Sequence, residues 1–370
     1  MNNIVPFFNY PELFNRHEAS LIEVFKDVGK RGAFIMQKDL EEFEQTLADY
    51  TGSKFAVGVA NATDGLQMGM MAGGLKNGGE VIISSHTMIA TASAIHFAGG
   101  IPVPVESSKD LMIDSASIEK AINKNTVAIM PTHLNGRTCN MDEIYNLAKK
   151  YSLDIYEDAA QALGSKFKEK FAGTFGIASA ISLYPAKILG TLGDGGAVLT
   201  NDKKVYENLL LLRDHGRDPK TGEVVSWGFN SRLDNLQAAF LNYFIKDYEN
   251  VIDRRRFLAS LYDEALSSIE EVQIPPGPQN GDHFDVFQNY EVRVQKRDEL
   301  KNYLAKKGIG TLVQWGGKAI HHFKSLKFNQ KLPVTDKIFS ELLMLPLNMF
   351  VSDDDVKYIV EEVKKFYKKK

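Results

Sequence analysis

Short apolar segments alternate with amphipathic ones between residues 54 and 202. The segments KFAVGVA, EVIISS, IPVPVE, TVAIMPTH, LDIYEDAA, SAISLYP and GGAVLTND are mostly apolar, and helical patterns such as TDGLQMGMMAGGL and TASAIHFAGG lie between them. Apolar strands separated by helices are typical of a parallel sheet that is buried on both faces. This part of the chain is therefore predicted to be an α/β layer with a mostly parallel sheet.

The pattern changes after residue 242. Residues 246–269 predict one long charged helix, residues 286–294 a strand, and residues 353–370 an amphipathic helix with Asp-rich capping residues. This mixture is typical of an α+β unit, and 370 residues is long for one domain. We predict a large α/β domain at residues 1–242 and a smaller α+β domain at residues 243–370.

Composition narrows the class of protein. Hydrophobic residues make up 44% of the chain and charged residues 25%, as in ordinary globular proteins. The net charge of -3 supplies no attraction for nucleic acid or an anionic membrane, and no secretory signal or membrane-spanning segment is recognisable. The single cysteine, Cys139, excludes an intrachain disulfide and a multi-cysteine metal site, and it is expected to be buried. We expect a cytoplasmic protein without a metal.

The first candidate for chemistry is Lys187, in the segment SLYPAKILGTLGDGG. Its neighbours Ala186, Ile188 and Leu189 are apolar, and burial among them would lower the pKa of the amine. A neutral amine can form a Schiff base. The glycines that follow permit tight turns, and a Walker loop is excluded because the lysine precedes them. The alternative is an ordinary solvated lysine on a loop.

Asp158 ends an apolar segment in IYEDAAQALG, where small residues suggest that a helix follows. Ligands of open parallel sheets bind beyond the carboxyl ends of the strands, so this carboxylate is a second candidate. Asp is also a favoured helix N-cap, and that alternative stays open.

The segment ANATDGLQMG passes from a predicted strand into a predicted helix. Free backbone N–H groups and the positive end of the helix dipole make such a point a natural phosphate site, and Thr63 would add a hydroxyl donor. The alternative is a capped helix without a ligand. A phosphate site, a carboxylate at a strand end and a desolvated lysine are together the three contacts that pyridoxal 5'-phosphate (PLP) requires.

These segments, together with EVIISSHTMIATASAI, LRDHGR, GFNSRLDNLQAAFL and LMLPLNMFVSDDDV, follow an order that resembles the DegT/DnrJ/EryC1/StrS family of sugar aminotransferases. The resemblance covers nearly the whole chain. It implies the PLP-dependent transferase fold of type I, a PLP cofactor, and a homodimer with active sites at the subunit interface. One branch of the family has histidine in place of the lysine and catalyses dehydration, and the presence of Lys187 argues against that branch.

The resemblance also implies roles for individual residues. Lys187 corresponds to the Schiff-base lysine, Asp158 to the partner of the pyridine nitrogen, and Gln161 to the residue beside the cofactor ring and its hydroxyl. The residues that would bind the phosphate are Ala62, Thr63, Ser182 and, reaching across from the neighbouring subunit, Asn230.

For Asn230 the alternative is a cap on a helix that opens there, with Leu233, Leu236 and Phe240 on one side.

The chain departs from the family pattern in two places. Met88 stands where the family usually has an aromatic residue that stacks on the cofactor, so either its thioether or His86 would cover the ring. The segment VQWGGKAIHHF is also unusual and is expected near the sugar pocket. The candidate substrate contacts are His86, Tyr184, Trp315 and His321, although Trp315 could instead be a core aromatic.

The resulting prediction is a PLP-dependent aminotransferase that converts a nucleotide-linked keto-deoxysugar to the amino sugar. A C3 ketone is favoured over a C4 ketone, and L-glutamate is the expected amino donor. Two alternatives stay open: transamination of a cyclitol or other non-nucleotide ketone, and a PLP-binding regulator without catalysis.

Overall fold

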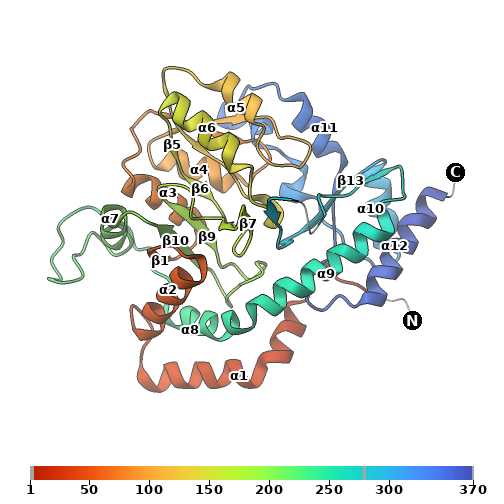
Figure 1. Cartoon of the computed structure of the whole chain (residues 1–370). Helices are drawn as coiled ribbons and strands as arrows, with labels where there is room; N and C mark the ends of the chain where they lie inside the picture. Colours follow the sequence, from red (N-terminus) through yellow and green to blue (C-terminus); the bar gives the residue numbers. More distant parts are fainter. Residues whose placement is uncertain (1–3, 278–280, 369–370) are drawn as a thin grey trace.

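The computed structural model describes residues 4–277 and 281–368, and its main feature is one twisted sheet (Figure 1). The strands follow the order β3-β2-β4-β5 and continue as β6-β9-β10-β1. β5 and β6 are consecutive pieces of one segment, because the backbone N–H of Tyr156 donates to Ile129 (3.1 Å) and that of Asp158 to Pro131 (3.0 Å), beside β4. Within this sheet β10 runs antiparallel to both of its neighbours, and the other pairs are parallel. The predicted α/β fold with a mostly parallel sheet is confirmed.

The strands of this sheet are β1 (Phe55–Val59), β2 (Glu80–Ser84), β3 (Ile101–Val105), β4 (Thr126–Met130), β5 (Asp154–Ile155), β6 (Glu157–Asp158), β9 (Ser179–Ser182) and β10 (Gly196–Thr200). The helices around it are α1 (Tyr10–Arg31), α2 (Lys38–Thr51), α3 (Ala62–Ala72), α4 (Ile89–Phe97), α5 (Ser115–Ala121), α6 (Met141–Tyr151), α7 (Lys203–Arg213) and α8 (Asn235–Phe244).

Both faces of the sheet are buried. Val81 and Ile83 of β2 belong to the core that α3, α4 and α7 cover, whereas Ile82 between them belongs to the core under α5 and α6. Side chains of a strand alternate between its faces, so a strand covered on both sides must be apolar at successive positions. This explains why the strands were recognisable as continuous apolar segments.

A second, antiparallel sheet has the order β11-β13-β14. Its elements and the helices near it are β11 (Val272–Gln273), β13 (Tyr290–Val294), β14 (Leu342–Leu345), α9 (Tyr248–Leu266), α10 (Arg297–Lys306), α11 (Pro333–Glu341) and α12 (Asp353–Lys368). A third, small sheet contains β7 (Lys166–Phe167), β8 (Lys170–Phe171) and β12 (His283–Phe284).

Helix α9 joins the two main cores. Its residues Tyr248 and Ile252 pack in the core of the large sheet, and Leu258 and Tyr262 pack in the core of the second sheet. The predicted boundary after residue 242 falls inside α8, and the division into two domains stays a prediction. Within the described residues, no helix has the length and apolar character needed to cross a membrane.

Candidate active site

The register of the large sheet brings the ends of four strands together. Val59 of β1 pairs with Gly196 of β10, and Gly196 pairs with Ser182 at the end of β9. Asp158 of β6 pairs with Ala180 of the same strand β9. Residues that are far apart in the sequence therefore meet at one edge of the sheet, which is where ligands of such sheets bind.

Helix α3 begins at this edge. A Cβ on Gly196 would lie 2.7 Å from the backbone nitrogen of Ala62, so only glycine allows the helix start to approach β10 so closely. The Asn61 side chain caps the helix by accepting from the Asp64 N–H (2.9 Å). Ala62 and Thr63 occupy the first turn, whose N–H groups have no partner within a helix. The arrangement places a helix N-terminus, a kind of site that can bind an anion, beside Ser182.

Asp158 lies in the floor of the site and is 5% exposed. Its carboxylate accepts a hydrogen bond from Thr91 Oγ1 of α4 (2.6 Å) and one from the Ala160 N–H (3.2 Å). Burial raises the pKa of Asp158, while these two bonds and the charge of Lys187 act in the opposite direction. Residues 159–164, all described, contain turns at 160–161 and 163–164 and no helix. The expectation of a helix after Asp158 is therefore wrong, and with it the N-cap alternative.

Lys187 follows β9 in a tight loop, in which its N–H donates to the carbonyl of Tyr184 (2.8 Å). Burial lowers the pKa of its amine to about 8, and the charge of Asp158 opposes this effect only in part. At pH 7 about one amine in ten is then neutral, far more than for a solvated lysine. Lys187 is thus a partly buried amine that feels the charge of Asp158, unlike an ordinary surface lysine.

Gln161 is oriented by a residue that the sequence analysis missed. The backbone N–H of Asn135 donates to Gln161 Oε1 (2.8 Å), so the amide NH2 of Gln161 stays available as a donor. Asn135 in turn donates to Glu291 (2.7 Å) and accepts from Gln314 (2.5 Å). Asn135 has a left-handed backbone (φ 56), and Asn tolerates this conformation. The tolerance of Asn for this conformation was the one local signal in the segment HLNG that pointed to Asn135.

Thr91 was also missed. It is a polar residue on the buried side of helix α4, whose other buried residues are Ala92, Ala94 and Ile95, and a buried hydroxyl needs a partner. Here that partner is Asp158.

The two candidates for covering the cofactor ring lie in different environments. His86 is fully buried, lies 3.1 Å from Gln314 Oε1 through its Nε2, and packs edge-on against Phe339. Burial lowers the pKa of His86 to about 3, so the ring is neutral. Met88 is half-exposed at the N-terminus of α4, the helix that also carries Thr91.

The remaining predicted substrate contacts are spread out. Tyr184 is half-exposed and precedes Lys187 in the same loop. Trp315 is partly buried against the core under α5 and α6, and its indole nitrogen is buried with no hydrogen-bond partner among the described residues. His321 is buried, and its Nδ1 lies 2.7 Å from Ser85 Oγ.

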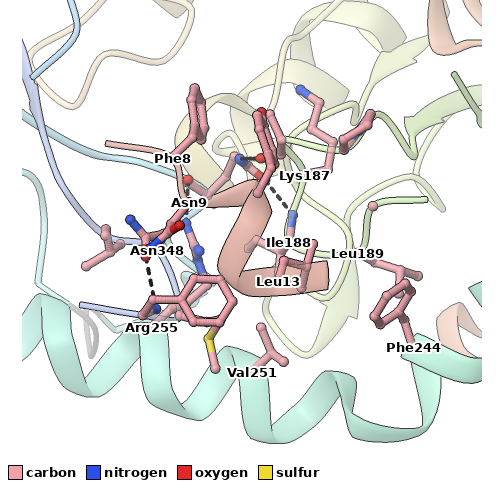
Figure 2. A pocket seen from close by; sticks show the side chains of 18 of the residues that line it. Phe8, Asn9, Leu13, Lys187, Ile188, Leu189, Phe244, Val251, Arg255 and Asn348 are labelled. Atoms are coloured by element: carbon pink, nitrogen blue, oxygen red, sulfur yellow. Dashed lines mark hydrogen bonds between the residues drawn. The ribbon is translucent and has the colours of Figure 1, made fainter. Parts of the chain in front are cut away.

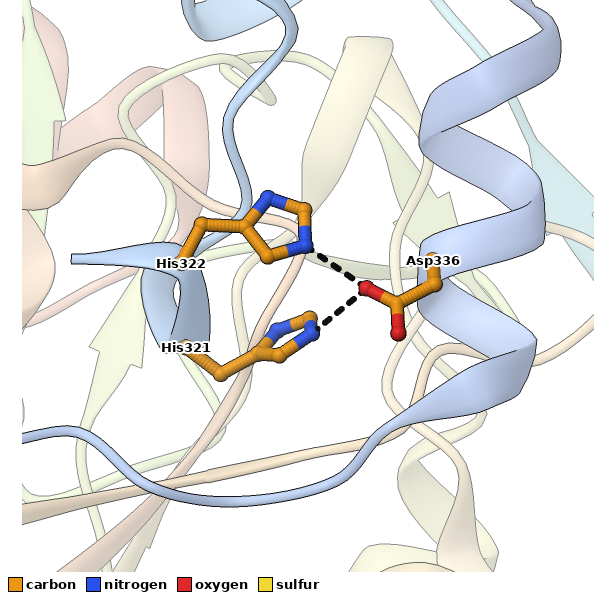
Figure 3. A group of neighbouring side chains, drawn as sticks. All are labelled: His321, His322 and Asp336. Atoms are coloured by element: carbon orange, nitrogen blue, oxygen red, sulfur yellow. Dashed lines mark hydrogen bonds and ion pairs between the residues drawn. The ribbon is translucent and has the colours of Figure 1, made fainter. Parts of the chain in front are cut away.

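His321, His322 and Asp336 form the one group in the described part of the chain whose atoms are close enough to bind a metal ion (Figure 3). Nε2 of His321 and of His322 lie 2.8 and 2.6 Å from the same Asp336 oxygen. Nδ1 of His322 accepts the N–H of Ala319 (3.1 Å), so the ring proton is on Nε2, which must lose it to bind a metal. The group is therefore built as a hydrogen-bonded clamp between residues 319–322 and α11, and we call it the histidine clamp.

Asn230 is exposed and pairs with Asp214 in an isolated antiparallel bridge. Helix α8 begins only at Asn235, after Asp234. The expectation that a helix opens at Asn230 is therefore wrong, and Asn230 caps nothing. The segment before it, residues 215–229, projects from the molecule beside α7 (Figure 1) and carries Trp227, which is 97% exposed.

A cavity with a volume of about 730 Å³ lies beside the Lys187 loop (Figure 2). Its lining includes Pro185 to Gly190, Phe8 and Tyr10 before and at the start of α1, and Arg255 and Asn348. Asp158 and the start of α3 do not line it. Lys187 therefore stands between this cavity and the strand edge.

Comparison with known proteins identifies the fold and the family. A model of the DegT/DnrJ/EryC1/StrS aminotransferase family matches residues 15–364. The chain belongs to this family. The model describes aminotransferases, and relatives that match most of the chain are named as sugar transaminases, so the predicted class of PLP-dependent transaminase is confirmed. The type I fold is confirmed by the solved structures.

Three relatives illustrate the range of the family. A dTDP-3-amino-3,6-dideoxy-alpha-D-galactopyranose transaminase of Aneurinibacillus thermoaerophilus is 35% identical, with 98% of this chain and 99% of the relative covered. A pleiotropic regulatory protein of Geobacillus stearothermophilus is 34% identical, with the same coverage. The crystal structure of DesV of S. venezuelae, in complex with a ketimine intermediate, superimposes with a TM-score of 0.94 at 32% identity over 99% of both chains.

Proposed function

We propose that the protein binds PLP and uses it to aminate a nucleotide-linked keto-deoxysugar at C3, with L-glutamate as amino donor. The observation that carries the proposal is the meeting of Lys187, Asp158 and the start of α3 at one edge of the large sheet. These are an amine with a lowered pKa, a buried carboxylate and an anion-binding helix terminus.

The residues present fit the cofactor. The N–H groups of Ala62 and Thr63, with the Ser182 hydroxyl, would bind its phosphate. Asp158 would form a charge-assisted hydrogen bond with the pyridine nitrogen. Met88, rather than the enclosed His86, would cover the ring. When bound, PLP supplies an aldehyde that bonds to amines and a protonated ring that accepts electrons.

The chain itself supplies proton transfer and orientation. An amine with a pKa of about 8 holds and releases protons near neutral pH, so Lys187 acts as general acid and base. Thr91 holds one oxygen of Asp158 and thereby directs the carboxylate. Gln161 presents an NH2 donor because the Asn135 N–H already occupies its oxygen.

Two features support the choice of substrate. A relative that matches nearly the whole chain is named as a transaminase of a dTDP-3-amino sugar, which favours a nucleotide sugar with nitrogen at C3. Tyr184 is half-exposed in the Lys187 loop and is the best-placed of the predicted sugar contacts. His321 already has protein partners at both ring nitrogens. It would therefore shape the pocket and not donate a hydrogen bond to the sugar.

A homodimer completes the proposal. Residues 219–230, the tip of the projecting segment together with Asn230, are all exposed, and an exposed tryptophan is typical of an interface. Asn230 would then reach the phosphate site of the neighbouring subunit.

The predicted cytoplasmic location belongs to this proposal and stays a prediction.

The experiment gives the PLP-loaded protein three ketones with L-glutamate: a dTDP-3-keto-6-deoxysugar, its 4-keto isomer and a keto-cyclitol. We expect 2-oxoglutarate and an aminated product of the 3-keto sugar, detected by mass spectrometry. Product from the 4-keto sugar or the cyclitol alone would overturn the substrate assignment. A regulator without catalysis, the reading that the Geobacillus relative's name favours, would form no 2-oxoglutarate with any of them.

A further inference from the structure

The Lys187 loop is held by the side chain of Gln288, which lies just before β13 of the second sheet. Gln288 donates from Nε2 to the carbonyl of Ala186 (2.8 Å) and accepts at Oε1 from the N–H of Ile188 (3.0 Å). One partner is a carbonyl and the other an N–H, so a single orientation of the amide satisfies both.

The two contacts fix the backbone on both sides of Lys187. The Ala186 carbonyl belongs to the peptide plane that precedes the lysine Cα, and the Ile188 N–H belongs to the plane that follows it. Each peptide unit is planar. Fixing two adjacent planes therefore fixes φ and ψ of Lys187 and the direction in which its side chain leaves the backbone.

Gln288 is itself held firmly. Arg255 of α9 donates from Nε to the carbonyl of Phe287 (2.8 Å) and from Nη2 to that of Gln288 (2.7 Å). A Cβ on Gly136 would lie 2.6 Å from the Gln288 backbone nitrogen. The backbone at Gly136 therefore packs directly against that of Gln288. Gln288 is 7% exposed, and water competes little for its amide.

We propose that Gln288 is a positioning residue for the reaction: it sets the direction of the Lys187 amine and links it to α9 and β13. This rests on the proposed function, because the position of the amine matters only if the amine reacts. A displacement of a reacting group by about 1 Å can cost up to about a hundredfold in rate.

The test compares three variants of the PLP-loaded protein. Gln288→Ala removes both contacts. Gln288→Glu keeps the size of the side chain, but a carboxylate repels the Ala186 carbonyl, and only the protonated acid can donate to it as the amide does. Gln237→Ala is the matched control. In wild type, Gln237 Oε1 accepts from Thr191 Oγ1 (2.5 Å) and from the Leu192 N–H (3.2 Å). The substitution therefore loosens the same loop but removes no contact to the peptide groups on either side of Lys187.

Three quantities are measured against wild type: kcat, KM, and the rate at which borohydride traps cofactor on Lys187 between about pH 5 and 9. For Gln288→Ala we expect kcat to fall about ten- to a hundredfold with KM changed less than about threefold. The trapping rate should fall in parallel, while Gln237→Ala should lose less than about threefold in both. Gln288→Glu should resemble Gln288→Ala at high pH and approach wild type as the pH falls, when each value is divided by that of wild type.

The outcomes separate the two proposals. If wild type traps no cofactor on Lys187, the proposed function fails. If wild type traps cofactor and Gln288→Ala does so at the wild-type rate, or Gln237→Ala loses as much as Gln288→Ala, the positioning role fails while the function stands. A Gln288→Glu protein without recovery at low pH would also overturn the role, because this variant keeps the shape and differs only in the missing proton.

Discussion

Two polar clusters lie at the carboxyl ends of strands in the same sheet, and they differ in how far the protein satisfies them. In the histidine clamp, beyond β2, His321 and His322 have partners at every ring nitrogen, and Asp336 accepts from both. In the cluster at the ends of β6 and β9, burial lowers the pKa of the Lys187 amine, and the charge of Asp158 opposes this shift only in part. A satisfied cluster holds the fold together, whereas buried charges without full partners are available to a ligand.

The largest effect is expected for Lys187→Ala. It removes the amine that lies within reach of the Asp158 charge, so turnover should fall by about a thousandfold or more. Peptide mass spectrometry after borohydride treatment should find no cofactor adduct. Lys246 also lines the cavity beside the Lys187 loop. The control variant Lys246→Ala should keep wild-type turnover and the cofactor adduct. An adduct on a different lysine in the Lys187→Ala protein would show that the site is misassigned.

Asp158→Asn should reduce turnover by about a hundredfold. The amide can still accept from Thr91 but carries no charge for the pyridine nitrogen. Cofactor content, measured by absorption after gel filtration, should change much less, because the phosphate contacts remain. Near-normal turnover in this variant would return Asp158 to a structural role.

Glu291→Gln tests the polar network behind Gln161. Burial raises the pKa of Glu291 to about 8. The folded state thus favours the protonated acid, and stability is lost as pH rises from the unfolded pKa through about 8. Because the amide has no such cost, the free energy of unfolding of the variant relative to wild type should rise by up to about 1.4 kcal/mol per pH unit in this window. Urea melts at several pH values measure it. Parallel curves would mean that Glu291 ionises as easily in the folded protein as in the unfolded one.

The smallest effect is expected for Asp336→Ala, which opens the histidine clamp. Loss of the shared acceptor should cost about 1 kcal/mol, while kcat of the folded enzyme stays within about threefold of wild type. Zinc should not raise the melting temperature of the wild-type protein, because Nδ1 of His322 faces an N–H donor. A zinc-dependent rise that Asp336→Ala abolishes would show that the clamp is a metal site after all.

The sequence by itself determined the layers of the fold and the chemical character of the main site residues. A strand buried on both faces must be apolar throughout, and an amine among apolar neighbours loses solvation, so the α/β layer and Lys187 were visible in local composition. The membership of a family added roles for Asp158 and the start of α3. These are properties of short segments, and short segments can be interpreted before the chain is folded.

The tertiary structure decided which distant groups meet. Only the strand register brings Ser182 beside the start of α3, and only the packing of α9 and β13 brings Gln288 across about a hundred positions of sequence to the two peptides that flank Lys187. Burial of His86 behind Gln314 and exposure of Asn230 likewise depend on what the rest of the chain covers. A hydrogen bond between distant residues leaves no periodic trace in a sequence, because its strength depends on geometry that folding alone creates.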